Sequence, residues 1–241
     1  MVTAISVVRD FSLYRRCLRE NPKCGNMEFV ALDNTVTNEP IPIRYNRFLD
    51  DCNDLGDSWL LFCHEDFEPR ESIEKKIDEL SLDEHALYGP IGCRRKGFAG
   101  FGMQVYCGEI EECKREGVGE PWKVGRPIVA PVEVETFDCC CLLVHSALIR
   151  QYDLRFDEEL QFDLYVEDFC AAAKLHHGIK SYAIPFKACH HSGSAPTDRL
   201  YRHLPYLKQK YTHDYFTATC TYFGTPSWQK RLQDFMLAIV R

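Results

Sequence analysis

A run of five apolar residues at positions 59–63 limits what this chain can fold into more than any other feature. A strand with apolar side chains on both faces has to be covered on both faces, as in the centre of an α/β sheet. The run leads directly into His64, Glu65 and Asp66. Three ionisable side chains at the end of a buried strand are costly unless they face water, a metal ion or a ligand. The run therefore predicts an α/β core with a polar site at one edge.

Predicted strands and helices alternate along the first 90 residues. Apolar periodicity predicts strands at 5–8, 29–32, 59–63 and 87–90, and helices around 11–18, 45–49 and 73–80. This alternation predicts a parallel sheet with right-handed crossovers. In such sheets, ligands bind beyond the carboxyl ends of the strands. Asp33 and the segment His64-Glu65-Asp66 follow strands directly, so we expect both at that edge.

The second half of the chain has a different pattern. Residues 92–130 are rich in glycine and charge, which predicts an insertion or a mobile loop. The sheet is then expected to resume at 132–134 and 139–144, followed by a helix over 166–177, a strand at 182–184 and a last helix from Pro226. The apolar stripe of that last helix would pack on the core, form a homodimer seam or make peripheral contact with a membrane.

Composition excludes several classes of protein. The chain has 241 residues, of which 45% are hydrophobic, enough for one substantial core. A net charge of −7 argues against a general nucleic-acid binder. No apolar run approaches the roughly 18 residues that a membrane span needs, and the N-terminus has the pattern of a strand and not that of a signal peptide. A cytoplasmic protein with no nucleic-acid partner is expected.

Thirteen cysteines require an explanation. Several lie in apolar surroundings, as in Cys139-Cys140-Cys141, where neighbours on a strand would point to opposite faces. The chain has no CxxC pair, which argues against a structural zinc site. We expect reduced, buried thiols that act as small hydrophobic residues, and hence a reducing cytosol.

Two acidic segments could carry chemistry. A carboxylate at His64-Glu65-Asp66 could hold Mg²⁺ or Mn²⁺ against a diphosphate, although a solvated loop before a helix would look the same. Glu167 and Asp168 open the predicted helix over 166–177. There they could cap the helix, or one of them could act as a base toward an acceptor hydroxyl.

Other candidates are less specific. His190 and His191 follow a strand, and because neighbours on a strand face opposite ways, at most one of them should be a metal ligand. Asp33 and Asn34 could make a turn, or Asp33 could accept hydrogen bonds from a nucleobase or ribose. Asp138 precedes the cysteine segment, and Arg94 in the basic run 94–96 could steer a diphosphate or be solvated surface.

Taken together, these segments resemble the GT-A-type glycosyltransferases, most closely inverting family 2 and its short bacterial members. The order carries the resemblance, which covers most of residues 5–193. The matching segments are Ile5-Ser6-Val7-Val8, Val30-Ala31-Leu32-Asp33-Asn34, Leu60-Leu61-Phe62-Cys63-His64-Glu65-Asp66, Thr136-Phe137-Asp138 with the strand after it, Tyr165-Val166-Glu167-Asp168-Phe169-Cys170, and His190-His191-Ser192. His64 stands where the family's metal motif begins with Asp.

The resemblance implies a role for each of these positions. Asp33 and Asn34 would contact the donor nucleotide, with His64, Asp66 and Arg94 also on the donor side. Asp66, with His64 and either His190 or His191, would hold Mn²⁺ or Mg²⁺. Asp168 would be the general base, and Glu167 and Asp138 would lie on the acceptor side.

The fold class implied is α/β, a single GT-A-type, Rossmann-like domain with a mixed, mostly parallel sheet. Residues 1–193 would form it, with a nucleotide-binding half at 1–90 and an acceptor half at 91–193, followed by a helical extension at 194–241. The expected activity is transfer of a sugar from a nucleotide-diphosphate donor to a glycan or lipid-linked acceptor, in the setting of surface polysaccharide synthesis and at the inner face of the membrane. A nucleotidyltransferase and an inactive binding or assembly protein are the alternatives.

Overall fold

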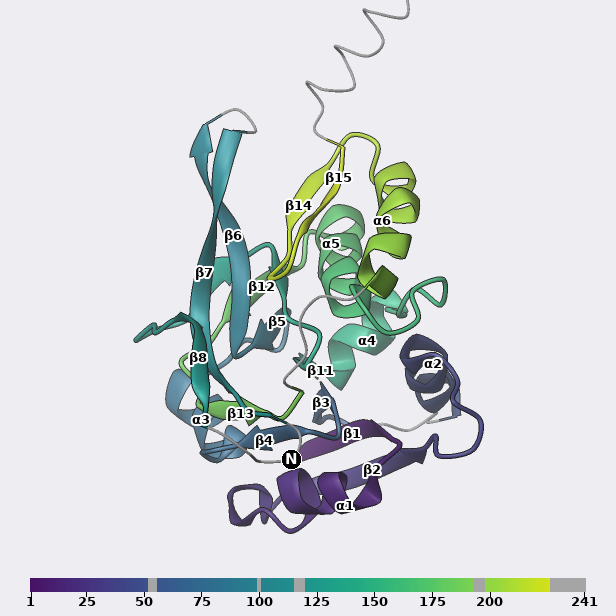
Figure 1. The fold of residues 1–241 in the computed structure, drawn as a ribbon. Coiled ribbons are helices and arrows are strands. Elements are labelled where there is room, and N and C mark those ends of the chain that lie inside the picture. The colour runs from purple at the N-terminus through teal and green to yellow at the C-terminus, as the bar shows by residue number, and fades with distance from the viewer. Residues whose placement is uncertain (52–55, 99–100, 115–119, 193–197, 226–241) are drawn as a thin grey trace, which may run out of the picture.

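The computed structural model describes residues 1–51, 56–98, 101–114, 120–192 and 198–225. The described residues form a mixed α/β fold (Figure 1). Its central sheet has the strand order β2-β1-β3-β11-β5-β12-β9. The strands are β1 (Val2–Val8), β2 (Glu28–Asp33), β3 (Trp59–Cys63), β5 (Ala86–Gly89), β9 (Val132–Val134), β11 (Cys141–His145) and β12 (Lys180–Ala183).

The central sheet is mixed. Strands β2, β1, β3, β5 and β12 run in one direction, and β11 and β9 run against them. The predicted parallel sheet is therefore confirmed for β1 with its neighbours β2 and β3, and β11 interrupts it. The strand predicted at 139–144 is β11, which begins at Cys141, so Cys139 and Cys140 precede it.

Helices cover both faces of this sheet, because its strands alternate apolar side chains between two cores. Ile5 and Phe62 lie in one core with α2 (Ile41–Asp51), α4 (Ser146–Tyr152) and α5 (Tyr165–His177). Ala4 and Leu61 lie in the other with α1 (Phe11–Tyr14), the π-helical turn η1 (Arg15–Arg19), the 3-10 turn η2 (Pro22–Cys24) and α3 (Ile73–Leu80). The prediction that the strand at 59–63 is buried on both faces is confirmed.

The prediction of an insertion or mobile loop at 92–130 is wrong for most of that segment. Strands β6 (Ile91–Phe98), β7 (Phe101–Glu112) and β8 (Trp122–Arg126) occupy it and belong to a second sheet with β10 (Thr136–Phe137), β13 (Ala188–His190) and β4 (Phe67–Pro69). The prediction failed because it took glycines as a sign of a loop, whereas two of them lie in strands at points where the backbones of neighbouring strands approach closely. Gly108 and Gly125 have φ of +86° and +100°, and a Cβ on Gly108 would lie 2.0 Å from the carbonyl oxygen of Pro90.

The segment after 193 contains more than a helix within its described part. Helix α6 (Asp198–Lys210) is followed by a hairpin of β14 (Tyr215–Thr217) and β15 (Tyr222–Gly224), which lies beside α6 in Figure 1. The helix predicted from Pro226 lies outside the described residues. Among the described residues, no helix combines the length and the apolar character needed to cross a membrane.

Candidate functional site

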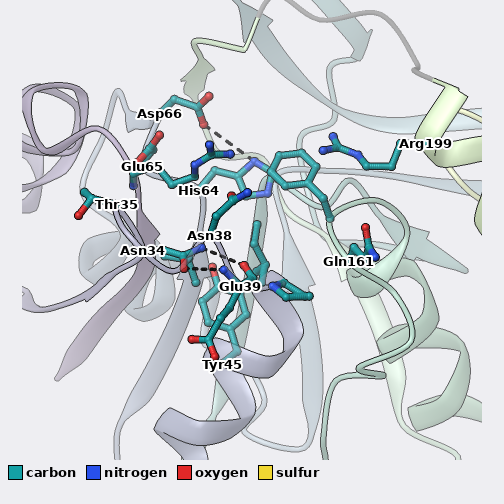
Figure 2. A pocket seen from close by; sticks show the side chains of 15 residues that line it. Asn34, Thr35, Asn38, Glu39, Tyr45, His64, Glu65, Asp66, Gln161 and Arg199 are labelled. Carbon is teal, nitrogen blue, oxygen red and sulfur yellow. Dashed lines mark hydrogen bonds and ion pairs between the residues drawn. The ribbon is translucent and has the colours of Figure 1, made fainter.

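A cavity of about 650 Å³ lies at the carboxyl ends of β1, β2 and β3 (Figure 2). The topology puts it there, because the chain leaves β1 for β2 on one side and β3 pairs with β1 on the other. The lining residues come from five stretches of chain: Val7 and Arg9; Asn34, Thr35, Asn38, Glu39, Pro40, Ile41 and Tyr45; His64, Glu65 and Asp66; Gln161 and Phe162; and Arg199 on α6.

Asn34 shapes the loop that forms one wall of this cavity. Its Oδ1 accepts hydrogen bonds from the backbone N–H of Glu39 at 2.9 Å and from the Thr37 hydroxyl at 2.9 Å, and its Nδ2 donates to the Glu39 carbonyl at 2.9 Å. Asp33 makes the turn before it, since its Oδ1 accepts from the backbone N–H and the hydroxyl of Thr35. The Asp33 carboxylate is exposed and is not among the lining groups.

Tyr165 sets the tautomer of His64. The Tyr165 hydroxyl donates its one proton to the Cys139 carbonyl at 2.9 Å, so at its 3.0 Å contact with His64 Nε2 it has to accept. His64 therefore carries its proton on Nε2. Burial lowers the pKa of His64 to about 4 despite the attraction of Asp66, which keeps the ring neutral at pH 7. The lone pair on Nδ1 is left facing His190 Nε2, 3.4 Å away.

His190 lies between two carboxylates. Its Nε2 is 3.4 Å from Asp66 Oδ1, and its Nδ1 is 3.1 Å from Glu112 Oε1. Burial lowers the pKa of His190, but the hydrogen bonds to Asp66 and Glu112 outweigh this effect and raise it to about 10. Glu112 is therefore the group that orients the ring and leaves Nε2 directed at Asp66 and His64.

His64, Asp66 and His190 together form a group that could hold a metal ion. One ligand atom from each lies within 4.8 Å of the others, and all three residues are buried. The chemistry fits a cation: two imidazole nitrogens and one carboxylate form the inner set. Tyr165 and Glu112 orient the two rings from outside, as partners of metal-binding histidines commonly do.

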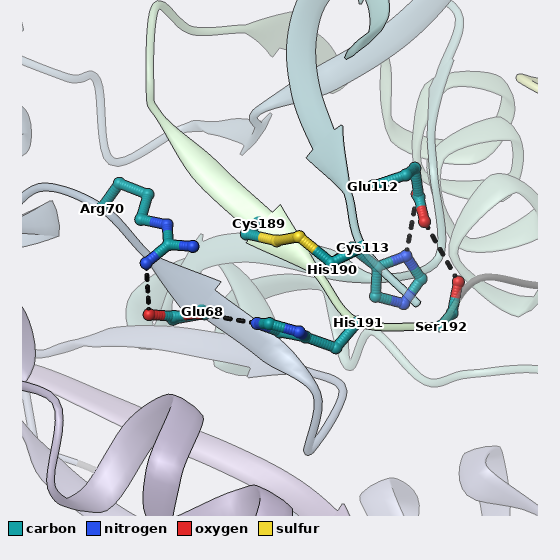
Figure 3. Close-up of a disulfide and its surroundings, with 8 residues drawn as sticks. All are labelled: Glu68, Arg70, Glu112, Cys113, Cys189, His190, His191 and Ser192. Carbon is teal, nitrogen blue, oxygen red and sulfur yellow. Dashed lines mark hydrogen bonds and ion pairs between the residues drawn. A yellow bond between two sulfur atoms is a disulfide. The ribbon is translucent and has the colours of Figure 1, made fainter. Parts of the chain in front are cut away.

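The neighbouring His191 points away from this group. Its Nε2 contacts Glu68 Oε2 at 2.6 Å, and Figure 3 shows the rings of His190 and His191 directed to different partners. The alternation of side chains about β13 explains the difference. Of the two histidines, His190 is therefore the one that lies with His64 and Asp66 in the possible metal site.

Asp138 lies beside the metal-ligand group, and its charge acts on the buried Glu167. A carboxylate oxygen of Asp138 lies within 4.8 Å of ligand atoms of Cys140 and His190. The Asp138 carboxylate also accepts hydrogen bonds from the Thr219 hydroxyl at 2.8 Å and the Cys140 N–H at 3.1 Å. Glu167 is 2% exposed, and burial followed by the charge of Asp138 raises its pKa well above the usual value. Burial therefore favours the protonated form of Glu167.

Asp168 is held elsewhere. Its Oδ1 lies 2.8 Å from Lys210 Nζ and accepts a 2.7 Å hydrogen bond from the Tyr211 hydroxyl, both on or next to α6. It is 2% exposed and, like Asp138, is not among the residues that line the cavity. The predicted role of general base does not fit this position, because the carboxylate ties α5 to α6.

Arg94 also lies apart from the cavity: it is exposed on β6 and is not among the lining residues. Other residues that shape the site were not predicted. Glu112 lay in the expected loop, Tyr165 appeared only in the segment that resembles the family's helix, and Arg199 lies in the segment after 193, for which no resemblance was found. The alternation of apolar residues around Tyr106 and Ile110 could have indicated a strand that reaches Glu112.

Cys113 and Cys189 differ from the expected state of the cysteines. The structure joins them in a disulfide between the end of β7 and β13, with Cα atoms 6.6 Å apart (Figure 3). The other described cysteines are free, and most are buried, as expected of thiols that serve as small hydrophobic residues. Burial raises the pKa of Cys63 to about 12, so this thiol is inert at neutral pH.

Comparisons with known proteins do not assign the chain to a family. No protein-family model matches the sequence, and no curated protein matches it.

Proposed function

We propose that the chain is an inverting GT-A-type glycosyltransferase and that the cavity at β1, β2 and β3 binds a nucleotide-diphosphate sugar. One observation carries it. His64, Asp66 and His190 come from distant parts of the chain, and their ligand atoms gather within 4.8 Å of one another beside that cavity. This is the arrangement needed to bring a cation and a diphosphate together.

The cavity offers suitable chemistry for a donor. Arg9 and Arg199 supply positive charge at its wall, where a diphosphate would be bound. The loop around Asn34 and Thr35 offers backbone and side-chain polar groups to the nucleoside. A divalent cation held by Asp66 and the two imidazoles would neutralise the negative charge that develops on the departing diphosphate. The two nitrogen ligands favour Mn²⁺ over Mg²⁺.

The proposed base is Asp138. It is half-buried and lies beside His190, whereas Asp168 is engaged by Lys210. In the proposed step the acceptor hydroxyl loses its proton to Asp138, its oxygen bonds to the anomeric carbon, and the bond from that carbon to the diphosphate breaks. Glu167 is a positioning residue, since burial raises its pKa and so opposes a second negative charge near Asp138. The acceptor class proposed is a glycan or a lipid-linked saccharide.

Donor binding by the purified full chain tests the proposal. Thermal unfolding would be followed with UDP-, GDP- and dTDP-sugars, each with and without Mn²⁺. We expect one nucleotide class to raise the melting temperature, and to do so more strongly with Mn²⁺. His190→Gln should abolish the Mn²⁺-dependent part. His145→Gln is the matched control, because His145 is also a buried histidine but caps α4 outside the cavity.

Release of nucleoside diphosphate with a set of saccharide acceptors would then test transfer itself. Asp138→Asn should lower the rate about 10²–10⁴-fold while donor binding is retained. If no sugar nucleotide changes the melting temperature with or without Mn²⁺, the proposal is wrong, and a binding or assembly protein with this fold becomes the better reading.

A further inference from the structure

A second group of metal-ligating side chains lies on the other side of β13 from His190. One ligand atom from each of Cys113, Cys189 and His191 lies within 4.8 Å of the others, and all three residues are buried. No CxxC pair marks this group in the sequence, since Cys113 and Cys189 are 76 residues apart. The pairing of β7 with β13 brings them together.

His191 is prepared to bind a cation. Its Nε2 lies 2.6 Å from Glu68 Oε2, and Arg70 in turn contacts Glu68 Oε1 at 2.6 Å (Figure 3). Its other ring nitrogen, Nδ1, is buried and has no hydrogen-bond partner among the described residues. A buried imidazole that leaves one nitrogen unpaired while a carboxylate holds the other is the form that zinc-binding histidines take.

We infer that Cys113, Cys189 and His191 form a zinc site when the two cysteines are reduced. Two thiolates and an imidazole suit Zn²⁺ better than Mg²⁺ or Mn²⁺. Tetrahedral zinc with bonds of roughly 2.0–2.3 Å sets its ligand atoms about 3.3–3.8 Å apart. The three ligand atoms are therefore close enough for small side-chain adjustments to complete the site, with a water molecule in the fourth position.

The chemistry connects two states of the same sulfur atoms. Two small-molecule thiols reduce the Cys113–Cys189 disulfide, forming two cysteine thiols and one small-molecule disulfide. Zn²⁺ then binds the two sulfurs and displaces both thiol protons. Both states join β7 to β13 at residues adjacent to Glu112 and His190, whose side chains lie 3.1 Å apart. In a reducing compartment, where a disulfide would not persist, the zinc site would keep β7 and β13 joined and so keep Glu112 in contact with His190.

Cobalt substitution tests the inference, because thiolate-bound Co²⁺ has a near-ultraviolet charge-transfer band that nitrogen and oxygen ligands lack. The full chain, reduced with a phosphine, should develop this band with one equivalent of Co²⁺, and added Zn²⁺ should remove it. Cys189→Ala should lose the band. Cys24→Ala should keep it, since Cys24 is an equally buried free thiol outside the group. Glu68→Gln should weaken Co²⁺ binding about 10–100-fold.

Wild-type protein provides a second measurement if Cys189→Ala does not fold. Zn²⁺ should protect Cys113 and Cys189 from alkylation in the reduced protein, as located by peptide mass spectrometry. Absence of the thiolate band in reduced wild type, its persistence in Cys189→Ala, or equal alkylation with and without Zn²⁺ would each overturn the inference. His64→Ala should keep the band, so a failure of the transferase proposal is distinguishable from a failure of this one.

Discussion

The hydroxyl oxygen of Tyr165 lies 3.0 Å from His64 Nε2 and 2.9 Å from the carbonyl oxygen of Cys139. This chain of two hydrogen bonds has a direction, because the hydroxyl has one proton and gives it to the carbonyl. His64 has to donate from Nε2, and its Nδ1 lone pair then faces Asp66 and His190. Tyr165 on α5 thereby fixes the tautomer of His64, the candidate metal ligand that follows β3.

Removal of this hydroxyl should weaken metal binding. In Tyr165→Phe the His64 ring loses the acceptor that fixes its tautomer, and we expect Mn²⁺ affinity to fall about 10–100-fold. Titration calorimetry on the metal-free protein would measure it. Tyr88→Phe is the control, because Tyr88 is also a buried tyrosine that donates to a backbone carbonyl, that of Asp83, away from the cavity. Equal affinity in both variants would contradict the tautomer argument.

Asp168→Asn should act on stability more than on the chemical step. The change removes the charge that faces Lys210 in a largely buried contact, for which we expect a loss of about 2–4 kcal/mol in unfolding free energy. Urea denaturation would measure this, with Asp50→Asn as an exposed ion-pair control expected to change it by less than about 1 kcal/mol. Turnover of the folded variant should stay within a few-fold of wild type; a loss as large as that of Asp138→Asn would return the role of base to Asp168.

Glu167 should make stability depend on pH. Its folded pKa is raised by burial, so between the unfolded pKa near 4.3 and the folded pKa the unfolded state releases a proton that the folded state keeps. Each pH unit in that window costs the wild type about 1.4 kcal/mol, and the loss stops above the folded pKa. Glu167→Gln does not titrate, so its stability relative to wild type should rise as the pH is raised through that window. Parallel denaturation curves at each pH would check this, and a constant difference would exclude a raised pKa.

Asn34→Ala should damage both the loop and donor binding. The side chain makes hydrogen bonds to Thr37 and to both backbone groups of Glu39, and their loss should cost about 1–3 kcal/mol. Because the loop lines the cavity, the affinity for the sugar nucleotide should also fall. Ser72→Ala is the comparison, since it removes the N-cap of α3, at a cost of about 1 kcal/mol, without touching the cavity. A variant that loses stability but binds donor normally would show that the loop only supports the fold.

Local patterns were sufficient for the central strands and their helices. The run at 59–63 forms β3 as predicted, and the helix predicted at 166–177 is α5, which ends at His177 and is followed by Gly178 in the left-handed conformation. Both predictions rest on neighbours within a few residues. The strands of the second sheet were missed because their glycines and charges resemble those of a loop, and only pairing between β6, β7 and β8 explains them.

The sequence by itself determined that His64 and Asp66 would follow a buried strand, since apolar periodicity is a local property of the chain. It also predicted that at most one of His190 and His191 would face the same site as a metal ligand, because neighbours on a strand point opposite ways. Only the tertiary structure decided that this residue is His190, that Glu112 and Tyr165 orient the two rings, and that Asp168 faces Lys210. These contacts join residues from separate strands and helices, and their geometry depends on sheet register and helix packing, which no short segment encodes.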